Sequence, residues 1–97
     1  MSVKLWNTSA LGVYGFAWYG SDKRRCEAEW FRGLREPLFS FYSAELGKMT
    51  PFIPIRNPER FGYWPLSNQS HAKALADFKA FVTAFAEECE EEGEADD

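Results

Sequence analysis

The chain has 97 residues, of which 45% are hydrophobic and 18% are aromatic, and its formal net charge is -4. This length accommodates one domain with one modest core, and the apolar content excludes a disordered chain. No apolar run approaches the ~18 residues of a membrane span, and the first six residues lack the layout of a signal peptide. We therefore expect a soluble intracellular protein located in the cytoplasm.

The negative charge is concentrated at the C-terminal end. Eight acidic residues and no basic residue lie between Glu87 and Asp97, whereas residues 1–86 carry seven acidic and eleven basic residues. The pattern predicts a single domain over residues 1–90 and a disordered acidic tail over residues 91–97. Such a tail is typical of a solvated segment that aids solubility. The alternative is that it shields the basic body or mimics a polyanion.

The first half of the chain predicts a β-hairpin. Lys4–Asn7 has the content of a short edge strand, and Val13–Tyr19 alternates aromatic with mostly small side chains. Residues 20–23 supply turn chemistry, and Arg24–Arg32 again alternates apolar with charged positions. These two alternating segments form the clearest hairpin in the sequence.

The middle of the chain predicts shorter strands. Pro37–Leu46 favours a strand over a short helix because aromatic residues alternate with serines. Pro51–Ile55 contains two prolines, which restrict it to an edge or irregular strand. Residues 57–60 resemble a turn, and Phe61–Trp64 is expected to form a last short strand.

The last predicted element is a helix from Asn68 to about Glu90, which Ser67 or Ser70 would cap. Apolar residues recur there at alternating spacings of three and four, and Ala74 and Phe81 widen the stripe. The positions on this line are Leu75, Phe78, Val82, Phe85 and Cys89. The expected fold class is therefore α+β, a small antiparallel β-meander of three to five strands packed against one C-terminal amphipathic helix.

An aromatic strand face next to a basic hairpin tip is one candidate binding site. Rings that stack on bases and cations that follow phosphates are typical of single-stranded nucleic-acid binding. The competing interpretation places the three rings in the core beneath the helix, and it is favoured because the other face of the strand offers only Val13, Gly15 and Ala17. The small face would then be exposed, or another backbone would approach it closely. The residues of this candidate site are Tyr14, Phe16, Trp18, Lys23, Arg24 and Arg25.

A second candidate is an apolar cluster in the last third of the chain, which has more apolar area than one helix covers. Part of it is expected at the surface as a partner-binding patch. Its members are Phe52, Ile53, Ile55, Phe61, Tyr63 and Trp64.

Catalytic and metal chemistry find little support in the sequence. His71 is the only histidine, and Cys26 and Cys89 belong to no CxxC pair, so we expect no metal, no cofactor and reduced thiols. Glu27 and Glu29 lie two apart on a strand face, which is more typical of a solvated sheet face than of a paired-carboxylate site. An aromatic small-molecule pocket is the least favoured interpretation; its residues would be Trp30, Tyr63, Trp64 and His71.

These features favour a binding protein over an enzyme. The leading hypothesis is a small intracellular protein-interaction module without catalytic activity, an accessory or inhibitor protein of the kind carried by mobile elements. Its partner would be another protein or a second copy of the chain. The alternative is a single-stranded nucleic-acid-binding protein.

Overall fold

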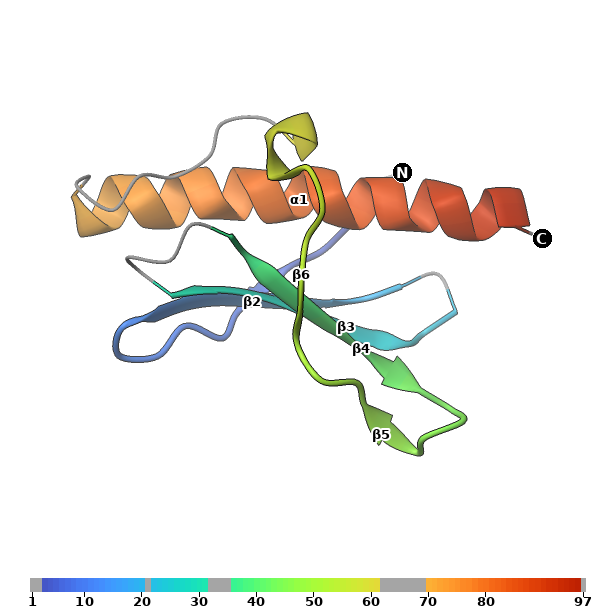
Figure 1. The fold of residues 1–97 in the computed structure, drawn as a ribbon. Coiled ribbons are helices and arrows are strands. Elements are labelled where there is room, and N and C mark those ends of the chain that lie inside the picture. The colour runs from blue at the N-terminus through green and yellow to red at the C-terminus, as the bar shows by residue number, and fades with distance from the viewer. Residues whose placement is uncertain (1–2, 21, 32–35, 62–69, 97) are drawn as a thin grey trace.

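The computed structural model describes residues 3–20, 22–31, 36–61 and 70–96. It shows an antiparallel sheet of short and long strands with one long helix across a single face, which confirms the predicted α+β meander (Figure 1). Along the sheet the order is β1-β2-β3-β4-β5, and β6 also pairs with β4. The elements are β1 (Trp6–Asn7), β2 (Val13–Tyr19), β3 (Arg25–Phe31), β4 (Leu38–Ser43), β5 (Lys48–Met49), β6 (Ile53–Pro54), the 3-10 helix η1 (Pro58–Phe61) and α1 (His71–Asp96).

The β2–β3 hairpin forms the centre of the sheet. Phe16 lies opposite Ala28, and the pairing continues from Val13 with Phe31 to Tyr19 with Arg25. In the turn, the Lys23 amide donates to the Gly20 carbonyl at 2.8 Å, and Lys23 has a positive φ of 65°. The two strands end within one residue of the boundaries that the alternating pattern predicts.

The strands after β3 are shorter and less regular than the hairpin. β4 occupies the segment predicted as a strand, and Gly47, at a φ of 70°, turns the chain into the two-residue β5. β6 pairs with β4 at the sheet edge, in keeping with its proline. The hydroxyl of Ser40 donates to the Thr50 carbonyl at 2.6 Å and ties the β5–β6 connection to β4.

The prediction of a last strand over Phe61–Trp64 is wrong for Phe61, which ends the 3-10 helix η1; Tyr63 and Trp64 lie outside the described residues. η1 is held against α1 rather than against the sheet. Phe61 packs edge-on against Phe81 and Phe85, with ring centres 5.6 and 5.2 Å apart, and Arg60 forms an ion pair with Glu88.

Helix α1 begins where Ser70 caps it, because the Ser70 hydroxyl accepts a bond from the Lys73 amide at 3.3 Å. Its bounds are His71–Asp96. The division into a domain over residues 1–90 and a disordered acidic tail over residues 91–97 stays a prediction.

The core lies between α1 and the sheet. Ala74, Phe78, Phe81, Val82 and Phe85 of the helix are buried there, which confirms the predicted apolar stripe, while Leu75 and Cys89 at its margin are half-buried. On the sheet side, the buried rings are Tyr14, Phe16, Trp18 and Trp30.

Candidate functional site

Helix α1 lies along one side of the sheet, and no helix of the described residues lies on the other side (Figure 1). Side chains alternate between the two faces of a strand, and residues opposite each other in neighbouring strands share a face. Since Tyr14, Phe16 and Trp18 point to α1, the alternate positions point away from it. We call this second surface the outer face; its residues are Trp6, Val13, Gly15, Ala17, Tyr19, Arg25, Glu27, Glu29, Phe31, Leu38, Ser40 and Tyr42.

Large aromatic side chains are exposed on the outer face. Their exposed fractions are 36% for Trp6, 56% for Tyr19, 39% for Phe31 and 40% for Tyr42. The rings of Trp6 and Tyr19 lie 5.2 Å apart, and the Arg25 guanidinium carbon lies 5.3 Å from the centre of the Trp6 ring. An aromatic surface with an arginine stacked on it is the composition that anchors many protein interfaces.

Two carboxylates stand in the middle strand of this face. Glu27 accepts a hydrogen bond from Arg25 Nε at 2.9 Å, and this bond raises the pKa of Arg25 further above neutrality. Glu29 is half-buried beside it. Burial raises the pKa of the Glu29 carboxyl above its ordinary value, and the charge of Glu27 raises it further. Both carboxylates lie on the sheet face as predicted, but only Glu27 has a cationic partner among the described residues.

The small positions of β2 are covered by the segment that follows β1. A Cβ atom on Gly15 would lie 2.7 Å from the Thr8 hydroxyl oxygen, and the Ser9 hydroxyl accepts a bond from the Gly15 amide at 2.9 Å. The Thr8 amide also donates to the Gly15 carbonyl at 2.9 Å, so another backbone approaches Gly15 closely, one of the two outcomes expected from the sequence. The buried Thr8 hydroxyl has no hydrogen-bond partner among the described residues.

The predicted partner-binding patch is divided by the fold. Phe52 and Ile53 are exposed at the β6 edge, with exposed fractions of 38% and 44%. Ile55 and Phe61 are core residues, at 2% and 8%, because the chain between β6 and η1 passes from the sheet to the helix. Tyr63 and Trp64 lie outside the described residues. Of the four members that the structure describes, two are therefore exposed and two are buried.

The predicted nucleic-acid site is divided as well. Tyr14, Phe16 and Trp18 are exposed by 3% or less, so no base can stack on them in this fold. At the hairpin tip, Lys23 and Arg24 are exposed, and Arg24 forms an ion pair with Asp22 at 3.2 Å. The basic tip is present, but the aromatic platform beside it is the core.

His71 and Trp30 do not form the small-molecule site considered above. His71 occupies the first residue of α1, where Nδ1 lies 3.1 Å from the Tyr14 hydroxyl, and Trp30 is buried with its ring stacked on Tyr14. His71 is exposed at the helix start and contacts Tyr14 there.

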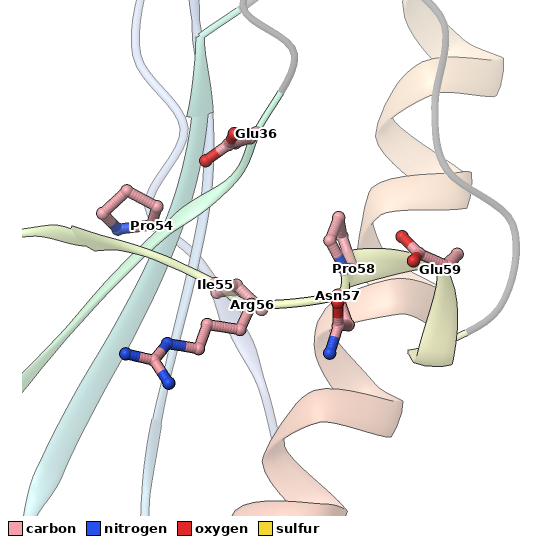
Figure 2. A pocket seen from close by; sticks show the side chains of 7 residues that line it. All are labelled: Glu36, Pro54, Ile55, Arg56, Asn57, Pro58 and Glu59. Atoms are coloured by element: carbon pink, nitrogen blue, oxygen red, sulfur yellow. The ribbon is translucent and has the colours of Figure 1, made fainter.

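One pocket of about 630 Å³ opens where the chain crosses from the sheet to the helix. The carboxylates of Glu36 and Glu59 stand at opposite ends of it, and the Arg56 side chain extends away from both (Figure 2). The other lining residues are Pro54, Ile55, Asn57 and Pro58. Because these charged groups do not converge on one point, the arrangement offers no acid–base pair for chemistry.

Comparison of the chain with family models, with curated proteins and with solved structures finds no match. Within the described ranges, no helix has the length and apolar content to cross a membrane. The same ranges hold no group of three or more histidine, cysteine, aspartate or glutamate side chains that could bind a metal ion.

Proposed function

We propose that the protein is a protein-interaction module that binds a different protein through its outer face. The observation that carries this proposal is the exposure of Trp6 and Tyr19, whose rings lie 5.2 Å apart, and of Phe31 and Tyr42 on the same sheet face. Exposed apolar side chains that gather on one face commonly mark interaction sites. Tyrosine, tryptophan and arginine are the side chains on which binding energy concentrates at protein interfaces.

The charges of the outer face favour a partner protein over nucleic acid. The two carboxylates Glu27 and Glu29 occupy its central strand, and the nearest cation, Arg25, is engaged by Glu27. A phosphate backbone laid across these rings would meet negative charge. Nucleic acid is therefore the competing outcome of the test and not the expected one.

The same charges favour a different protein over a second copy. In a two-fold dimer of outer faces, residues near the axis meet their own counterparts. Glu27 and Glu29 lie on the central strand of the face, so their carboxylates would oppose carboxylates of the other copy. Juxtaposed like charges cost several kcal/mol at an interface.

Site-specific photo-crosslinking tests the proposal. A benzophenone amino acid is placed at Tyr19 on the outer face, and the matched control carries it at Lys79 on the exposed side of α1. Both proteins are illuminated in an extract of the source cells, with and without nuclease treatment. We expect one defined protein to be crosslinked from position 19 and not from position 79, and the purified partner to rebind wild type but not a Tyr42→Ser variant.

Three results would overturn the proposal. They are equal crosslinking from both positions, crosslinks from position 19 only to a second copy of the chain, and loss of all crosslinks on nuclease treatment. The second result would establish a homodimer, and the third would move the function to nucleic acid.

A further inference from the structure

Charge on the outer face is not balanced. Arg25 donates to Glu27 at 2.9 Å and stacks over Trp6, so these two charged groups compensate each other. Glu29 is the other carboxylate of the face, and it forms no hydrogen bond or ion pair with a described residue. Among the described residues, the outer face therefore presents one half-buried carboxylate without a cationic partner.

The described neighbours of Glu29 offer it no counter-charge. Across the sheet it lies opposite Gly15 on one side and Leu38 on the other, and Phe31 follows it on the same face. Its Cγ atom is 3.6 Å from the point where a Gly15 Cβ would stand, and the Thr8 hydroxyl lies 2.7 Å from that point. The Thr8 hydroxyl makes no hydrogen bond to a described residue, so it does not solvate the carboxylate.

We infer that the partner protein places a lysine or arginine side chain on Glu29, with its aliphatic stem along Phe31 and Leu38. This inference rests on the proposed function and names the chemistry of the partner. A basic side chain supplies the positive counter-charge for the Glu29 carboxylate. The apolar neighbours of Glu29 suit the methylene stem of a long basic side chain. The face already holds one cation in this manner, since Arg25 lies between a ring and a carboxylate.

An acidic contact at the same position is unfavourable. A carboxylate or phosphate above Glu29 would add a third negative charge beside Glu27 and Glu29 in a half-desolvated setting. An uncharged contact would bury Glu29 without a counter-charge, which also costs free energy. Charge complementarity thus selects a basic side chain.

A displayed library of random linear peptides is the probe that tests this inference. The library is selected on the wild-type protein, and the selected peptides are titrated against Tyr19→Ser, Glu29→Gln and the control Glu45→Gln in the exposed β4–β5 turn. We expect peptides that require Tyr19 and that carry a shared arginine or lysine. Glu29→Gln should weaken their binding roughly tenfold or more, and Glu45→Gln should leave it unchanged.

A double-mutant cycle then links the two charges. Replacing the shared basic residue of a peptide by methionine should weaken binding to wild type but add little to the loss in Glu29→Gln. Peptides that require Tyr19 but bind Glu29→Gln as tightly as wild type would overturn the inference and leave the proposed function standing. Peptides that ignore Tyr19→Ser, or no enrichment over a mock selection, would count against both.

Discussion

Gly15 is the residue at which the outer face is most tightly constrained. A Cβ there would lie 2.7 Å from the Thr8 hydroxyl, closer than van der Waals contact allows, whereas the Thr8 carbonyl at 3.5 Å is in ordinary contact. We expect Gly15→Ala to destabilise the protein by about 1 to 3 kcal/mol, as overpacking commonly does. Urea unfolding of the variant beside wild type measures the loss.

Thr8→Ala provides the matched rescue. It removes the oxygen that meets the new Cβ and also a buried hydroxyl without a hydrogen-bond partner among the described residues, so alone it should be near neutral. The double variant should recover most of the stability lost in Gly15→Ala. If Gly15→Ala is as stable as wild type, or if Thr8→Ala gives no recovery, the close approach of Thr8 to Gly15 does not constrain the fold.

Glu29 should make the stability of the protein depend on pH. Its pKa is raised in the folded state, so the folded chain binds more protons than the unfolded chain between the ordinary carboxyl pKa of ~4.3 and the raised value. Stability contributed by this group therefore falls as pH rises through that window. Glu29→Gln removes this pH dependence. At neutral pH the variant should be as stable as wild type or more stable, with a gain in the free energy of unfolding below about 1 kcal/mol because Glu29 is only partly buried.

Denaturant unfolding at neutral pH and below about pH 4 measures this difference. The advantage of Glu29→Gln should disappear at the lower pH, where the wild-type carboxyl is protonated in both states. Glu45→Gln in the β4–β5 turn is the control and should show no comparable change. A Glu29→Gln protein that is less stable than wild type at neutral pH would mean that the carboxylate is stabilised in the fold.

At the scale of elements, Phe78 makes the central contacts between helix α1 and the sheet. Phe78 is fully buried and contacts the rings of Phe16, Trp30 and Phe81, with centres 6.0 to 6.3 Å apart. Phe78→Ala should therefore cost about 3 to 5 kcal/mol. Its neighbour Lys79 is exposed, and Lys79→Ala should stay within about 0.5 kcal/mol of wild type.

Thermal unfolding followed by circular dichroism compares these two variants. The contrast between adjacent positions isolates packing from helix propensity, because alanine is the best helix former in both. Similar melting temperatures for Phe78→Ala and wild type would show that α1 does not pack on the sheet as described.

Local pattern predicted the long elements well and the short ones poorly. The β2–β3 hairpin and the stripe on α1 are readable because seven-residue alternation and repeated spacings of three and four leave little ambiguity. β5 and β6 contain two residues each, too few for a period, and tertiary pairing with β4 defines them. Phe61 was misassigned to a strand because its burial comes from α1, through contacts that sequence spacing does not show.

The candidate site followed from the sequence only in part. Tyr19 and Phe31 were readable in principle, since period two places both on the face opposite Trp18 once that ring is assigned to the core. The placement of Trp6 and Tyr42 on the outer face depends on how short strands pair with their neighbours. No local sequence pattern determines that register. Ile55 was misplaced at the surface because the crossing from sheet to helix that buries it spans residues of no regular period.

At the scale of the molecule, the two faces of the sheet differ in the exposure of their aromatic side chains. The inner face carries the buried rings of the core beneath α1, and Trp6, Tyr19, Phe31 and Tyr42 are exposed on the outer face. Helix α1 lies along the inner side only (Figure 1). One layer of strands thus presents two aromatic surfaces with opposite exposure. A pair of substitutions of the same residue type, one on each face, can distinguish their roles.

Trp18 and Trp6 form this pair, since their exposed fractions are 1% and 36%. Trp18→Ala should cost about 3 to 5 kcal/mol and leave the protein largely unfolded or close to unfolding, because the ring packs against Phe85. Trp6→Ala removes a ring that contacts Tyr19 and Arg25, so we expect a loss of about 1 kcal/mol. Melting temperature and crosslinking from position 19 are measured on both. A folded Trp6→Ala protein that no longer yields the crosslink would place binding on the outer face, whereas one that crosslinks like wild type would exclude Trp6 from the interface.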